Sequence, residues 1–109
     1  MKVLIVEDDV VIAESLGNEL SHWNYEVSIA KQFGNILEEF KTVEPELVLL
    51  DINLPTFNGY HWCQEIRKVS NVPIIFISSR TDNMDQIMAI QMGGDDFIEK
   101  PFNLSLTIA

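Results

Sequence analysis

The sequence predicts a single α/β domain in which one parallel sheet carries helices on both faces. Short apolar runs alternate with amphipathic stretches from one end of the chain to the other. The runs are continuously apolar, which is typical of strands buried on both faces of a parallel sheet. The chain has 109 residues, which is enough for one domain and too few for two.

Five segments are predicted as strands. The clearest are 2–6 (KVLIV), 46–50 (ELVLL) and 73–78 (PIIFIS), each rich in aliphatic residues. A weaker alternating run spans 25–29, and Phe97–Ile98 form a short fifth strand. Because each strand is followed by a helical pattern, a right-handed βα unit repeated about five times is expected.

Four segments, 10–22, 33–43, 60–69 and 83–92, have the apolar spacing of helices. The residues predicted to share an apolar face are Ile12, Leu16 and Leu20, then Phe33, Ile36, Leu37 and Phe40, then Trp62, Ile66 and Val69, and finally Met84, Ile87, Met88 and Met92. Only eight residues follow Pro101, so the last helix is expected to be truncated.

Charge and composition exclude several functions. Seven Lys and Arg oppose seventeen Asp and Glu, giving a formal net charge of -10, which disfavours binding of a phosphate backbone by this segment. No apolar run is long enough to span a bilayer. The single cysteine, Cys63, excludes an internal disulfide and fits a reducing compartment, so a cytoplasmic protein is expected.

Polar residues follow the predicted strands at the end where ligands bind in open α/β sheets. Glu7, Asp8 and Asp9 follow the first strand, Asp51 closes the third, Ser78 and Ser79 close the fourth, and Lys100 follows the fifth. Clustered carboxylates repel each other unless a cation joins them, and oxygen ligands without His or Cys favour Mg²⁺. A carboxylate such as Asp51 can accept a phosphoryl group, with Lys100 and Ser78 contacting its oxygens.

Each of these residues also has a simpler explanation. Asp8 or Asp9 could cap the following helix, and Asp51 precedes a turn, where Asp is common. Ser78 could be a capping residue and Lys100 a solvated charge. Taken together these explanations require independent coincidences at one sheet edge, which favours a phosphoryl-acceptor site.

The motifs VEDD, LLDINLP with NG, FISSR and GGDDFIEKPF together resemble the receiver domain of two-component response regulators, most closely the OmpR/PhoB type. The resemblance covers nearly the whole chain, so residues 1–109 are expected to form one receiver domain. It implies a doubly wound flavodoxin/CheY-like fold with five parallel strands in the order 2-1-3-4-5.

The resemblance also implies residue roles. Asp51 would accept the phosphoryl group and would ligate Mg²⁺ together with Asp8. The backbone carbonyl of Asn53 would be a further ligand, and Glu7 would act through water. Lys100 would pair with the phosphoryl oxygens.

Further implied roles concern the switch that follows phosphorylation. Ser78 and Phe97 stand at the switch positions, and the Lys100–Pro101 peptide bond would be cis. The surface that responds would comprise the fourth helix, the fifth strand and the fifth helix.

The family resemblance implies partners outside the chain. A histidine kinase would donate the phosphoryl group, and the full-length protein would form a homodimer through the switching surface. A DNA-binding output domain would follow the chain and contact promoter DNA, with no role for a membrane. Such a domain is not an enzyme beyond catalysing its own phosphorylation and dephosphorylation. The stretch YHWCQEIRKVSNVPIIFISSR resembles regulators that respond to cell-envelope-active peptide antibiotics.

Two other classes compete with a receiver. A phosphohydrolase of the haloacid-dehalogenase type also uses a strand-end Asp, a hydroxyl, a Lys and Mg²⁺. It would have a second Asp two residues after the nucleophile, where this chain has Asn53. A flavodoxin-like nucleotide or flavin binder would have a Gly- or hydroxyl-rich loop after the first strand, where this chain has acids.

Overall fold

A parallel sheet forms the centre of the molecule. The computed structural model describes residues 1–52, 54, 55, 57–78 and 96–99, and for residues 78 and 96–99 it describes the backbone. The strands are β1 (Lys2–Val6), β2 (Glu26–Ile29), β3 (Leu47–Asp51), β4 (Ile74–Ser78) and β5 (Asp96–Glu99). Their order is β2-β1-β3-β4-β5 and every neighbouring pair is parallel.

The predicted CheY-like parallel sheet is confirmed for the order 2-1-3-4. Strand β5 adds to it through its backbone, with Phe97 opposite Phe76. The strand boundaries move by about one residue from those predicted, and Asp51 closes β3 as expected. Val6, the last residue of β1, is opposite Leu50, so the neighbouring strands β1 and β3 end side by side.

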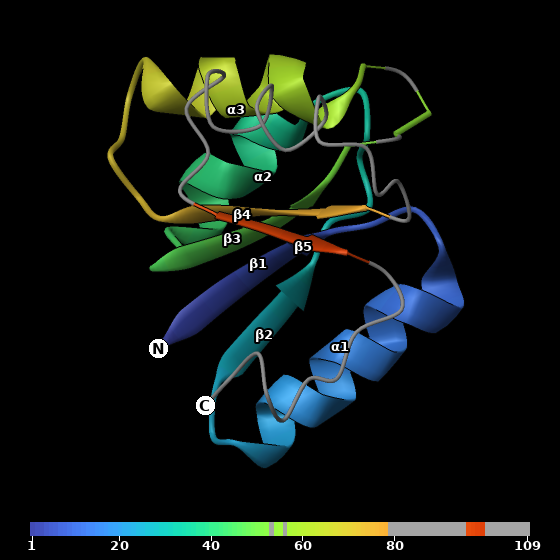
Figure 1. Cartoon of the computed structure of the whole chain (residues 1–109). Coiled ribbons are helices and arrows are strands. Elements are labelled where there is room, and N and C mark those ends of the chain that lie inside the picture. The colour runs from blue at the N-terminus through green and yellow to red at the C-terminus, as the bar shows by residue number, and fades with distance from the viewer. Residues whose placement is uncertain (53, 56, 79–95, 100–109) are drawn as a thin grey trace.

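Helices cover both faces of the sheet (Figure 1). Helix α1 (Val10–His22) lies on one face, and α2 (Ile36–Val43) and α3 (Gly59–Arg67) lie on the other. Among the described helices none is both long and apolar enough to cross a bilayer. The doubly wound arrangement follows from two separate apolar surfaces on the same strands.

Alternation along β1 explains the two cores, because successive side chains of a strand point to opposite faces. Val3 and Ile5 pack with α1, whereas Leu4 and Val6 pack with the α2 and α3 side. The α1 core contains Val3, Ile5, Ala13, Leu16, Leu20, Leu49 and Ile77. The larger core includes Leu50 and Phe76 from the sheet and Ile36, Phe40, Trp62, Cys63 and Ile66 from the helices. Each fully buried aliphatic side chain stabilises the fold by about 1.5–3 kcal/mol.

Helix α2 begins three residues later than predicted. Residues 32–35 form a turn instead, in which the Asn35 amide donates to the Gln32 carbonyl over 2.9 Å. The Glu39 carboxylate accepts the backbone N–H groups of Lys31 and Gln32, which fixes the chain before the helix. Phe33 reaches the core from this turn and not from a helix.

Helix α3 ends earlier than predicted, so the prediction that Val69 shares its buried face is wrong. The helix ends at Arg67 with Lys68 as its C-cap. Val69 then turns away from the helical register and is 55% exposed, whereas Trp62 and Ile66 are buried as expected. The helix predicted at 83–92 and the truncated last helix lie outside the described residues.

Candidate functional site

Three carboxylates meet where β1 and β3 end. Val6 is opposite Leu50 in the strand register, so Glu7 and Asp51 come next along the two neighbouring strands. One carboxylate oxygen from each of Glu7, Asp8 and Asp51 lies within 4.8 Å of the other two. Glu7 and Asp51 are 44 positions apart in the sequence, and the parallel pairing of β1 and β3 brings them together.

The cluster concentrates negative charge in a largely buried place. Glu7 is 3% exposed and Asp51 is 4% exposed, whereas Asp8 is exposed. A Glu7 carboxylate oxygen accepts the backbone N–H of Asp9 over 3.1 Å, which orients that side chain. Buried carboxylates are costly unless hydrogen bonds or a cation compensate their charge, so this arrangement favours a cation.

The neighbouring Asp9 has a different role. Its carboxylate Oδ1 accepts the backbone N–H of Val11 over 3.0 Å and that of Ile12 over 3.3 Å, which makes Asp9 the N-cap of α1. The sequence left open whether Asp8 or Asp9 caps this helix. The structure assigns the cap to Asp9 and places Asp8 in the carboxylate cluster.

The donor set fits Mg²⁺. All three side chains offer hard oxygen ligands, and their spacing allows one small cation to be approached by more than one carboxylate after modest side-chain adjustment. Mg²⁺ usually retains several waters and binds through one or two carboxylates. The three acids can supply those carboxylates, and the exposed one leaves room for the waters. The exposed Asp8 keeps the cluster open to solvent on one side.

Part of the expected site is placed by its backbone. Ile77 is opposite Asp51, so Ser78 lies one residue further toward the same sheet edge. Phe97 lies in β5 opposite Phe76. The side chains of Ser78 and Phe97 lie outside the described part of the structure, as do Asn53, Lys100 and Pro101, and their predicted roles stay predictions.

One residue near the site was not singled out from the sequence. Gly59 begins α3, and its N–H donates to the Ile52 carbonyl over 2.8 Å. In the sequence Gly59 belongs to the NG pair, which was considered only as part of the family motif. The contact between Gly59 and the backbone of Asp51 is visible only in three dimensions.

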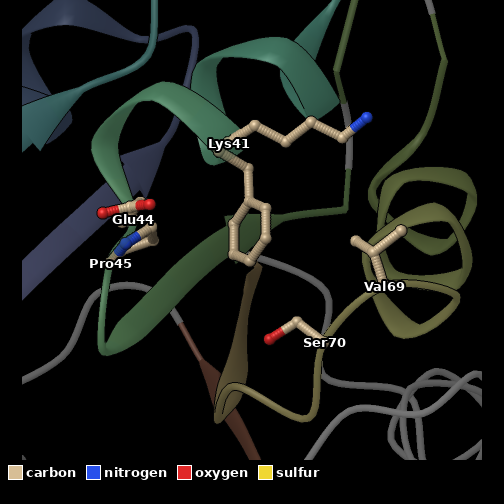
Figure 2. Close-up of a pocket in the computed structure, with 6 residues that line it drawn as sticks. Lys41, Glu44, Pro45, Val69 and Ser70 are labelled. Carbon is tan, nitrogen blue, oxygen red and sulfur yellow. The ribbon is translucent and has the colours of Figure 1, made fainter.

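A hollow on the opposite edge of the sheet is separate from this site (Figure 2). A cavity of about 460 Å³ lies between the C-terminal ends of α2 and α3. Its lining residues are Phe40, Lys41, Glu44, Pro45, Val69 and Ser70. These residues precede β3 and β4, so the cavity lies where the strands begin, whereas the carboxylates lie where β1 and β3 end.

Comparison with known proteins identifies the family. Residues 3–109 match the model of the response regulator receiver domain. The chain is 56% identical over 108 residues to the uncharacterized transcriptional regulatory protein YvcP of Bacillus subtilis, covering 99% of the chain and 46% of that protein. It is 43% identical over 109 residues to the response regulator protein GraR of Staphylococcus aureus, covering 100% of the chain and 49% of GraR. The chain thus spans about half the length of these curated relatives.

Solved structures agree with this match. One is the N-terminal domain of the nisin resistance regulator NsrR, described as a lantibiotic response regulator, with 48% identity and a TM-score of 0.89 over 98% of this chain and 91% of that one. Another is the BeF₃-activated receiver domain of Klebsiella pneumoniae RstA, with 28% identity and a TM-score of 0.94 over 99% of this chain and 92% of that one. With a parallel sheet in the CheY-like order and an acidic cluster at its carboxyl edge, the chain belongs to the response regulator receiver domain family, whose members are signalling domains and not classical enzymes.

Proposed function

We propose that this chain is the phosphoryl-accepting receiver of a transcriptional response regulator, and that a histidine kinase phosphorylates it on Asp51. The observation that carries the proposal is the meeting of Glu7, Asp8 and Asp51 within 4.8 Å at the ends of two central strands. The family match supports a receiver over the haloacid-dehalogenase alternative.

The reaction proposed for Asp51 is a displacement at phosphorus. A carboxylate oxygen of Asp51 forms a bond to phosphorus while the bond from phosphorus to the imidazole nitrogen of the kinase breaks. The leaving imidazole keeps the electron pair and takes a proton from solvent. Because Asp51 ends a strand held between β1 and β4, its main chain is fixed, while its carboxylate lies beside those of Glu7 and Asp8.

The acidic cluster would hold Mg²⁺ through Asp8 and Asp51, with the Asn53 carbonyl as a further ligand and Glu7 acting through water. Bound Mg²⁺ would neutralise charge on the transferred phosphoryl oxygens. Lys100 would pair with the same oxygens, and the Ser78 hydroxyl would donate a hydrogen bond to them. The backbone position of Ser78, one residue beyond the partner of Asp51, supports this assignment.

The switch is proposed to act through the surface made by the fourth helix, the fifth strand and the fifth helix. A new doubly charged group at Asp51 would draw Ser78 inward, and the Phe97 ring would occupy the space that Ser78 leaves. The Lys100–Pro101 peptide bond is proposed to be cis. The helix predicted at 83–92, strand β5 and a last helix would form the responding surface.

The whole protein is proposed to regulate transcription in the cytoplasm. Because the chain spans about half of YvcP and GraR, we expect a DNA-binding output domain in the remaining half, and residues 1–109 as the receiver. Dimerisation through the switching surface would present that domain to promoter DNA. The net charge of -10 supports DNA contact through the output domain and not through this segment.

The environmental signal is proposed to be a peptide antibiotic that acts on the cell envelope. The likeness to the N-terminal domain of the nisin resistance regulator NsrR, at 48% identity, supports this class of signal. Deleting the gene in its host should increase sensitivity to such peptides, measured as the concentration that inhibits growth. Unchanged sensitivity to nisin-like peptides, alongside intact phosphorylation of Asp51, would contradict the signal while leaving the receiver function standing.

Phosphorylation is tested directly with a small phosphodonor. Incubation of the purified protein with acetyl phosphate and Mg²⁺ should add one phosphoryl group, measured by intact mass. Asp51→Asn should take up none, whereas Asp9→Asn, which keeps the oxygen that caps α1, serves as the matched control and should take up one. Uptake by Asp51→Asn equal to that of the wild type would refute the proposed function.

A further inference from the structure

The start of α3 presses directly against the main chain of Asp51. A Cβ atom placed on Gly59 would lie 2.2 Å from the carbonyl oxygen of Asp51. It would also lie 3.0 Å from the carbonyl carbon of Asp51 and 3.0 Å from the Cα of Ile52. All three atoms belong to the backbone, so no side-chain rotation can relieve the contact.

Glycine is needed here for close approach and not for an unusual backbone angle. Gly59 is the first residue of α3, and its φ lies outside the left-handed region that favours glycine. The other described glycines are unlike it. A Cβ on Gly17 would meet only side chains at 3.5 Å, and a Cβ on Gly34 would meet nothing within 4 Å.

Two hydrogen bonds hold this contact together. The Gly59 N–H donates to the Ile52 carbonyl over 2.8 Å, which ties the helix start to the residue after Asp51. The Asn58 side chain caps the helix by accepting the N–H of His61 over 3.0 Å. The first turn of α3 is therefore fixed against the peptide unit that carries Asp51, which lies seven positions before Asn58 in the sequence.

We propose that Gly59 is a positioning residue for the phosphoryl acceptor. Because Gly59 has no side chain, the start of α3 can contact the main chain of Asp51 and hold it in position. This inference rests on the proposed function of Asp51. Moving a Cβ at position 59 from 2.2 Å to an ordinary contact of 3.4 Å requires a separation of about 1.2 Å, 3.4 minus 2.2. A displacement of about 1 Å at a reacting group can slow a reaction by about 100-fold.

The test compares Gly59→Ala with Gly17→Ala in the phosphorylation reaction. The rate of phosphoryl uptake from acetyl phosphate at saturating Mg²⁺ is measured by intact mass, at a temperature where circular dichroism shows each variant folded. Gly59→Ala should lower the maximal rate by about 10- to 100-fold, while the acetyl phosphate concentration that gives half the maximal rate changes less than about two-fold. Gly17→Ala should stay within about two-fold of the wild-type rate, because its added methyl group meets no backbone.

A second variant covers the case in which Gly59→Ala does not fold. Asn58→Ala removes the helix cap without adding atoms, and it should lower the maximal rate several-fold. Its control is Val72→Ala, a core truncation before β4 at the opposite sheet edge, which should destabilise the fold without lowering the rate of the folded protein.

The outcomes separate the two proposals. A wild-type protein that takes up no phosphoryl group refutes the proposed function and this inference with it. Normal wild-type uptake with an unchanged maximal rate in folded Gly59→Ala, or in Asn58→Ala where that variant stands in, overturns the positioning role alone.

Discussion

Replacing Asp9 by alanine should destabilise the protein while leaving its response to Mg²⁺ intact, whereas replacing Asp8 should do the reverse. The two residues are adjacent, but Asp9 caps α1 through Val11 and Ile12, and Asp8 belongs to the carboxylate cluster. Losing an N-cap side chain costs about 1 kcal/mol of unfolding free energy.

The expected change in Tm follows from chain length. Unfolding entropy of about 2.1 cal/mol/K per residue gives about 0.23 kcal/mol/K for 109 residues, so a loss of 1 kcal/mol lowers Tm by about 4 °C. Asp9→Ser keeps an oxygen acceptor and should recover most of that loss. Saturation with Mg²⁺ at ten times its Kd should raise the Tm of both Asp9 variants by about 6 °C, because mass action adds about 1.4 kcal/mol.

Asp8→Ala should behave in the opposite way. Removing one of three clustered carboxylates relieves repulsion, so Tm without Mg²⁺ should be equal to or higher than that of the wild type. Added Mg²⁺ should then raise Tm much less than in the wild type. The measurement is thermal unfolding followed by circular dichroism at several Mg²⁺ concentrations. A loss of the Mg²⁺ response in Asp9→Ala as large as in Asp8→Ala would refute this division of roles.

Two further predictions concern the parts of the fold that support the sheet. Glu39→Ala removes the acceptor for the Lys31 and Gln32 amides and should cost about 1 kcal/mol, with faster hydrogen exchange of those two amides by NMR; unchanged exchange would contradict the role of Glu39. Ile66→Ala truncates a side chain that is 0% exposed and should cost about 2–5 kcal/mol in denaturant unfolding. An equal cost for Val69→Ala, whose side chain is 55% exposed, would contradict the observed end of α3.

The parallel sheet and the acidic character of its edge could be predicted from the sequence alone. Local patterns suffice for this, because a continuous apolar run such as 2–6 predicts a buried strand wherever it lies, and acids directly after it must lie at the strand's end. The buried faces of α1 and α3 were predictable for the same reason, since a helix fixes which residues share a face.

Features that depend on contacts between residues distant in sequence could be found only in the folded chain. The choice of Asp9 as cap and Asp8 as cluster member depends on how α1 leaves β1, and both carry the same side chain, so composition cannot distinguish them. Helix α3 ends at Arg67, so Val69 is exposed. The sequence did not show this, because the apolar spacing of a helix continues past the residue at which the helix ends. Position 59 needs glycine because a Cβ there would lie 2.2 Å from the carbonyl oxygen of Asp51. The two residues meet only because α3 packs against β3, which the sequence does not show.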